Sequence, residues 1–179
     1  MTAIPNEITS AADTAVSLPD LAARFAELYP RWRDYKNRRH AEHEEFEARV
    51  LAATGMTFDE AEARGGILFE NYRAVRKQVI NDDAQRGLLD DDDPEDVIWD
   101  EINGLASSIL KHPALSMDDV RLQARAVAVF CLSYWTDVKS IDGLTWHMRR
   151  VIENFAAVAG VELLPGLDGV ESLDAVPMA

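Results

Sequence analysis

Apolar side chains return at every third or fourth position in five separate segments of this sequence. In the first segment the repeat consists of Leu21, Phe25, Leu28, Trp32 and Tyr35. Residues three and four apart share one face of an α-helix, so this spacing predicts a helix with one buried side. Similar repeats predict helices near 57–81, 94–112, 116–136 and 144–160. Because only a weak two-residue alternation at 161–164 competes with them, we expect an all-α fold.

Residues that begin and end helices occur at the boundaries of these repeats. Ser17 and Ser116 are suited to cap helix N-termini, and Thr57–Glu60 has the pattern of a capping box. Gly55 and Gly160 are suited to end helices in the left-handed conformation. Two breakers fall inside repeats: Pro30 is expected to kink or split the first helix, and Gly65–Gly66 is expected to interrupt the second.

A chain of 179 residues is long enough for one sizeable core and short for two domains. We expect a flexible arm at 1–16, a helical domain at 17–160 and an irregular, loosely held C-terminal tail at 161–179. The helical domain is interpreted as a single bundle of five or six helices. Its core should contain Phe25, Ile102, Val127, Phe155 and the rest of the last apolar stripe, which comprises Leu144, Met148, Val151, Ile152 and Val158. Trp146 lies opposite that stripe, and we expect another helix, rather than a partner, to cover it.

The formal net charge of −14 is large for a chain of this size. Such a field opposes binding to nucleic-acid phosphates or to anionic lipid. The chain shows neither a secretory signal nor an apolar run long enough to span a membrane. Its one cysteine, Cys131, lies in an apolar run and is interpreted as a small core residue. We expect a cytoplasmic protein that binds neither membrane nor nucleic acid.

A cluster of metal-ligating residue types occurs in the first predicted helix. His40, His43, Glu44 and Glu47 lie at spacings that place them on one helical side. Two imidazoles and two carboxylates are ligands that zinc or another divalent metal accepts. The other predicted helices carry no matching Glu-x-x-His pair of the kind that completes a di-iron site. A solvated polar helix face is therefore the favoured interpretation, with a metal site as the alternative and no cofactor expected.

The segment 82–101 contains ten acidic residues and one basic residue. Its spacing does not match a calcium-binding EF-hand loop. The segment is interpreted either as a solvated loop or as a surface that docks a basic protein through charge. The candidate partner-binding residues are Asp90, Asp91, Asp92, Asp93, Glu95, Asp96 and Trp99.

A third candidate is the stretch 31–39, in which five cations alternate with two aromatic residues. That composition suits contact with single-stranded nucleic acid. However, the helical repeat assigns Trp32 and Tyr35 to the buried face, which leaves the cations as a solvent border. Nucleophilic catalysis has less support, because Cys131 is expected to be buried and no nucleophile elbow or glycine-rich phosphate loop occurs. We therefore expect no enzyme.

The residues from Leu105 to Val129 include Ile109-Leu-Lys-His-Pro113-Ala114-Leu-Ser116 and Arg121-Leu-Gln-Ala124-Arg125-Ala126. This stretch resembles a helix, Pro-Ala-Ser/Thr turn, helix element of small acidic helical proteins from alphaproteobacterial genomes and prophages. The last helix, through Gly160, is similar too. The resemblance implies an all-helical fold and a bacterial or phage origin, and it implies no activity.

These observations favour a non-enzymatic helical binding protein that docks a basic protein partner through its acidic loop. One alternative is a metal-binding helical protein that uses the His40 to Glu47 face. The other is a homo-oligomeric structural protein.

Overall fold

The computed structural model describes residues 16–85, 95–137 and 142–173. Within these ranges the chain forms seven helices and no strand, which confirms the all-α prediction. Two more helices than the minimum expected arise because Gly65 divides the second segment and a single turn follows the fifth helix. The helices are α1 (Leu18–Thr54), α2 (Phe58–Arg64), α3 (Gly66–Gln85), α4 (Glu95–Leu110), α5 (Met117–Phe130), α6 (Ser133–Thr136) and α7 (Gly143–Ala159).

Local sequence signals account for most helix ends. The Ser17 hydroxyl accepts the Asp20 N–H at the start of α1, and Gly55 ends that helix with φ 71°. Thr57 and Glu60 form the predicted capping box at α2. Gly65 and Gly66 adopt positive φ values of 61° and 57°, which only glycine adopts without strain, so the chain turns there between α2 and α3.

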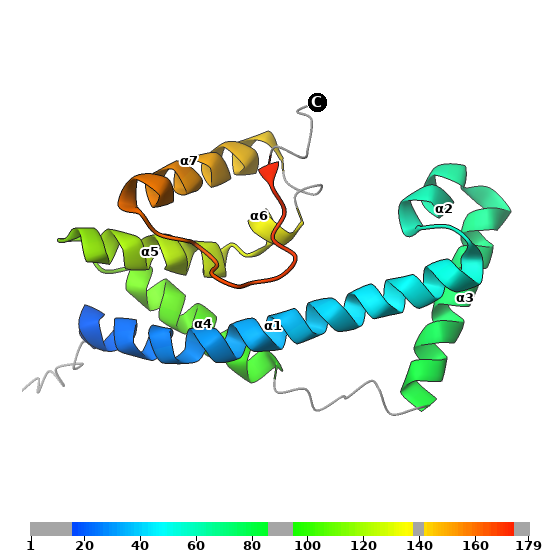
Figure 1. The fold of residues 1–179 in the computed structure, drawn as a ribbon, viewed down its shortest axis with the longest axis horizontal. Helices are drawn as coiled ribbons and strands as arrows, with labels where there is room; N and C mark the ends of the chain where they lie inside the picture. The colour runs from blue at the N-terminus through cyan, green and yellow to red at the C-terminus, as the bar shows by residue number, and fades with distance from the viewer. Residues whose placement is uncertain (1–15, 86–94, 138–141, 174–179) are drawn as a thin grey trace, which may run out of the picture.

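The longest helix, α1, runs through Pro30 without being split. Figure 1 shows it crossing the molecule, with α4 to α7 gathered around its N-terminal part and α2 and α3 at its other end. The protein is therefore elongated, with two separate hydrophobic clusters. No helix in the described ranges is long and apolar enough to cross a membrane.

The larger cluster, here called the main lobe, is built from the N-terminal part of α1 and from α4, α5 and α6. All five residues of the first predicted stripe are buried in α1. Leu21, Phe25, Leu28 and Trp32 pack against the buried stripe of α4, which includes Ile102, Leu105 and Ile109. Trp32 and Ile102 are both fully buried. Val127 was also expected in the core, but this residue is only half-buried.

The smaller cluster, here called the distal lobe, joins the C-terminal part of α1 to α2 and α3. Its buried residues are Val50, Ala61 and Tyr72. A two-pronged ion pair holds α3 against α1: the Arg49 guanidinium donates to both carboxylate oxygens of Asp83 at 2.6 and 2.8 Å. Between the lobes, residues 41–45 of α1 are all exposed, as expected from the polar composition of that stretch.

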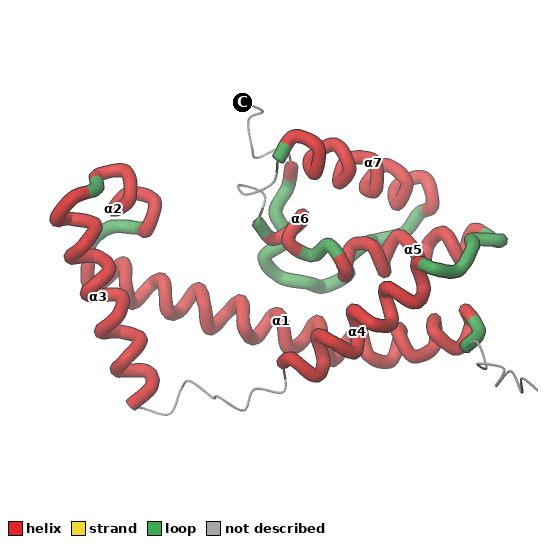
Figure 2. Tube along the Cα trace, turned by 180° about the vertical axis from the view of Figure 1, so that it is seen from behind, coloured by secondary structure: helices red, strands yellow, loops and turns green. Residues whose placement is uncertain are grey.

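The C-terminal segment 161–173 is irregular, as expected, but it packs more closely than the loosely held tail that the sequence suggested. It packs on the main lobe, where Leu164, Leu167 and Leu173 are buried. Figure 2 shows it passing beside α5 and α6. The Asn37 amide donates to the Gly166 carbonyl at 2.9 Å and accepts the Asp168 N–H at 2.8 Å. These long-range hydrogen bonds carry no periodic signal, so apolar spacing could not reveal them. The predicted arm, apart from Val16, lies outside the described residues.

The orientation of α7 is the second correction. Its apolar stripe was expected to face the core. Ile152 is half-buried and packs against the larger cluster, but the other five residues of the stripe are exposed, Phe155 by 62%. The opposite face packs inward instead, through Arg149, Ala156 and Ala159. Trp146 lies on this inner side and is half-buried, as expected for a residue covered by the fold.

Candidate interaction face

The four candidate metal ligands lie on the middle part of α1, but they do not form a ligand set. Glu47 is bound by Arg76 of α3 at 2.6 Å, and the His43 Nε2 lies 4.0 Å from Glu47. The His40 ring packs against Gly169, where an added Cβ would approach it to 3.0 Å. Glu44 is exposed. Among the described residues no group of three His, Cys, Asp or Glu side chains is placed to hold a metal, so the geometry gives the metal hypothesis no support.

The acidic docking surface is described only at its edge. Asp90, Asp91, Asp92 and Asp93 lie outside the described residues, and Glu95 and Asp96 form the first turn of α4. Trp99 is half-buried and already has partners within the chain. Its ring stacks on Trp32 with centroids 6.4 Å apart, and the Lys36 Nζ lies 4.7 Å above it. Trp99 therefore belongs to the packing of α4 on α1, and docking through the four aspartates remains a prediction.

The basic and aromatic stretch 31–39 serves the fold. Trp32 and Tyr35 are buried, as the helical repeat predicted. The neighbouring cations are engaged with carboxylates of the same helix: Arg33 with Asp34, and Arg39 with Glu42. The Cys131 thiol is half-buried rather than fully buried, and burial raises its pKa. A raised pKa lowers the thiolate fraction at neutral pH, which disfavours nucleophilic chemistry.

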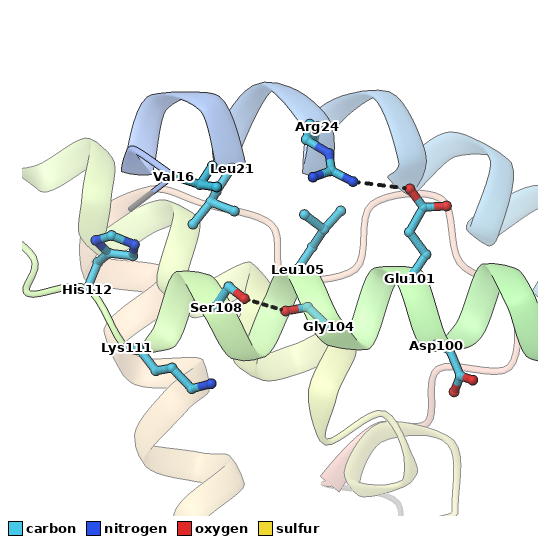
Figure 3. Close-up of a pocket in the computed structure, with 10 residues that line it drawn as sticks. All are labelled: Val16, Leu21, Arg24, Asp100, Glu101, Gly104, Leu105, Ser108, Lys111 and His112. Atoms are coloured by element: carbon cyan, nitrogen blue, oxygen red, sulfur yellow. Dashed lines mark hydrogen bonds and ion pairs between the residues drawn. The ribbon is translucent and has the colours of Figure 1, made fainter. Parts of the chain in front are cut away.

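A groove with a volume of about 790 Å³ lies between the start of α1 and α4 (Figure 3). Some of its polar groups are paired with one another. Arg24 and Glu101 approach to 3.6 Å across the groove, and the Ser108 hydroxyl donates to the Gly104 carbonyl at 2.8 Å. Figure 3 shows the side chains of Lys111 and Asp100 pointing away from this pair rather than converging with it. The groove therefore lacks the converging polar groups that orient a small ligand.

The inner face of α7 is organised by Arg149, which is only 1% exposed. Its guanidinium donates to the Glu153 carboxylate at 2.7 Å, to the Tyr134 carbonyl at 2.7 Å, and to the Glu171 carbonyl. The guanidinium carbon also lies 5.5 Å from the centroid of the Trp135 ring. These contacts join α7 to α6 and to the C-terminal segment, and they fix which face of α7 points inward.

The outer face of α7 is consequently left to solvent. It carries five large apolar residues, here called the α7 seam: Leu144, Met148, Val151, Phe155 and Val158. Their exposed fractions are 69%, 48%, 52%, 62% and 85%. Their spacing of four, three, four and three is that of the contact positions in a coiled coil. Such a stripe on a helix surface is suited to pack against another helix.

Among the residues of α7, no acidic side chain borders the seam. In helical projection His147 and Asn154 lie along one border, and Thr145 and Ile152 lie along the other. The whole helix contains two arginines and one glutamate, in a chain of net charge −14. The α7 seam is therefore an apolar strip with almost neutral surroundings on a strongly acidic molecule.

The sequence revealed the residues of this seam but not their surroundings. The apolar period was recognised, and it was assigned to the core. The signal that could have corrected the assignment is a second set of residues, Trp146, Arg149, Glu153 and Ala156, which also recur at three and four positions. A helix with two periodic faces can bury either one, and the contacts of Arg149 determine which.

This chain matches no model of a protein family, no curated protein and no solved structure.

Proposed function

We propose that this chain is a non-enzymatic helical binding protein and that the α7 seam is the face through which it docks another protein. The observation that supports this most directly is the exposure of all five seam residues. Their exposed fractions correspond to roughly 600 Å² of apolar side-chain surface, at the top of the range of about 300–600 Å² for the largest patch on a monomer. Patches of this size on monomers are often functional.

The chemistry of the remaining candidate sites supports the same proposal. Glu47, Trp99 and Arg149 all make contacts that hold helices together. In the groove between α1 and α4, Arg24 pairs with Glu101, and the Ser108 hydroxyl donates to the Gly104 carbonyl. Recognition of a partner helix requires no converging catalytic groups, and the seam has the spacing that this mode uses.

Capture experiments with tagged full-length protein test the proposal. The variant Val151→Glu/Phe155→Glu places two charges on the seam without altering a buried residue. Proteins retained from a lysate of the source should be retained by the wild type and lost by this variant. Because seam contacts are apolar, retention should persist at high salt, whereas docking through the acidic loop would weaken.

The matched control is Ile67→Glu, which adds a charge at a residue of α3 that is 77% exposed. It should retain the same proteins as the wild type. Equal capture by the wild type and the seam variant, with circular dichroism showing both to be folded, would exclude the seam as the docking face.

A further inference from the structure

The geometry points to a second copy of this chain as the partner: we infer that two α7 helices pair antiparallel through their seams to form a symmetric dimer. This inference rests on the proposed function, because it names the protein that the seam docks. A two-fold interface uses the same patch on both subunits, so that patch must be complementary to itself. The α7 seam meets this requirement in its order, its charge and its area.

The order of side chains along the seam is nearly symmetric about its middle. Val151 occupies the centre, the two largest residues, Met148 and Phe155, lie on either side of it, and branched aliphatic residues occupy the ends. When a second helix runs in the opposite direction, Val151 faces its own copy. Met148 then faces Phe155 of the other chain, and Leu144 faces Val158. Each layer of this pairing combines side chains of compatible size.

The charge around the seam also favours a second copy. Two chains of net charge −14 repel each other over most of their surfaces. The α7 residues that border the seam include no carboxylate, so two α7 helices can meet there without placing like charges of these helices opposite each other. A strongly basic partner would gain little at this face, because the seam offers it no acidic group to bind. The seam is therefore suited to apolar contact with a second seam of the same kind.

The area is sufficient for a stable dimer. An interface of standard size buries about 800 Å² on each partner. The seam alone provides roughly 600 Å² on each chain, or roughly 1,200 Å² in total, which is the lower end of the range of about 1,200–2,000 Å² for specific, stable interfaces. The seam spans fifteen residues of α7, or about 21 Å at the helical rise of 1.5 Å per residue.

The position of α7 leaves this face open to approach. Figures 1 and 2 show α7 along one edge of the molecule, with α5, α6 and the C-terminal segment all on its inner side. The α2 and α3 helices lie at the far end of α1. A second chain can therefore reach the seam without displacing a described element of the first.

Light scattering coupled to size-exclusion chromatography tests the inference with the purified full-length protein alone. The chain has a mass of 20.0 kDa, so a mass of about 40 kDa is expected at micromolar concentration. Val151→Glu/Phe155→Glu should reduce this mass to that of one chain, with an unchanged helical circular-dichroism spectrum. Ile67→Glu should remain a dimer. A wild-type protein with the mass of one chain over the whole concentration range overturns the inference.

Cross-linking tests the antiparallel direction. In a Cys131→Ser background, Val151→Cys lies at the centre of the pairing and should be joined to its own copy by a short bis-maleimide. Two Leu144→Cys chains should not be joined, because antiparallel pairing separates these positions by about 21 Å. A mixture of Leu144→Cys and Val158→Cys chains should be joined. Efficient self-linking at Leu144→Cys would contradict antiparallel pairing.

The two proposals fail in different ways. If the purified protein is a single chain but a different protein is captured through the seam, the proposed function stands and the second copy is excluded as its partner. If the purified protein is a single chain and seam charges change no capture, both proposals fail.

Discussion

Arg149 shows how one residue determines which surface the protein presents. A buried guanidinium is tolerated only when hydrogen bonds and a counter-charge replace water. Here Glu153 supplies the counter-charge, and the Tyr134 and Glu171 carbonyls accept two further hydrogen bonds. Because the two carbonyls belong to α6 and to the C-terminal segment beneath α7, Arg149 holds its own face of the helix inward. The exposure of the seam is therefore a consequence of this contact.

The first expected outcome concerns removal of this residue. Arg149→Met removes the donor shared by the Tyr134 and Glu171 carbonyls and leaves Glu153 with Arg150, at 3.8 Å, as its counter-charge. The free energy of unfolding should therefore fall by about 1–3 kcal/mol. Hydrogen exchange should accelerate in residues 161–173, because Glu171 loses its anchor. Urea unfolding and hydrogen-exchange mass spectrometry measure these effects.

Arg73→Met is the matched control, because Arg73 is exposed and its ion pair with Glu70 spans 3.7 Å. This change should cost less than about 1 kcal/mol. Unchanged protection of residues 161–173 in Arg149→Met would show that the segment is held by other contacts.

The phenol of Tyr29 makes a pH-dependent contribution to the free energy of unfolding. Burial raises its pKa to about 12, although Arg33 and Arg125 partly oppose this effect. Below pH 10 the folded and unfolded chains both keep the phenolic proton. Between pH 10 and 12 the unfolded chain loses it first, so the contribution of Tyr29 to stability falls as pH rises.

Comparison with Tyr29→Phe isolates this contribution. The variant also loses the 3.3 Å hydrogen bond from the hydroxyl to the Pro165 carbonyl. Between pH 9 and pH 11, the free energy of unfolding of the wild type should fall by about 1 kcal/mol more than that of the variant. A difference that is constant with pH would mean that the phenol ionises equally in both states.

At the scale of elements, α1 carries a proline that weakens it. Pro30 is exposed in the interior of a helix of 37 residues. It has no N–H to donate to the Ala26 carbonyl, and its ring crowds that carbonyl. Pro30→Ala should therefore raise the free energy of unfolding by about 2 kcal/mol, after allowance for the greater freedom of the unfolded chain.

Thermal and urea unfolding measure this change. The control is Ala23→Gly, at another exposed position of α1, which should lower the free energy of unfolding by about 1 kcal/mol. If Pro30→Ala lowers stability, the proline must shape α1 in a way that the rest of the fold requires.

The same scale shows which features sequence spacing can reveal. Capping residues such as Ser116 and Gly160 fixed the ends of α5 and α7, because caps act through neighbouring backbone groups. The α1 and α4 stripes were assigned correctly to the core. The seam was assigned incorrectly, because an apolar period shows that a helix has an apolar face and not which molecule covers it. The segment 161–173 was missed because hydrogen bonds from Asn37 and Arg149 hold it.

At the scale of the whole molecule, α1 connects two clusters that share no other described helix. The main lobe contains α4, α5 and α6, with α7 packed against it, and the distal lobe contains α2 and α3. The five residues between them on α1 are exposed, so side-chain packing does not couple the lobes there. Cooperative units of unfolding follow contiguous packing. The two lobes should therefore open independently.

Two truncations of fully buried residues, one in each lobe, test this independence. Val50→Ala should cost about 2 kcal/mol and should reduce exchange protection in α2 and α3 only. Ile102→Ala should cost about 2–5 kcal/mol and should reduce protection in α4 and α5 while leaving α2 and α3 unchanged. Hydrogen-exchange mass spectrometry on both variants distinguishes local from global effects. If either truncation lowers hydrogen-exchange protection equally in both lobes, α1 transmits unfolding along its length. In that case a dimer formed through α7 would stabilise the distal lobe as strongly as the main lobe.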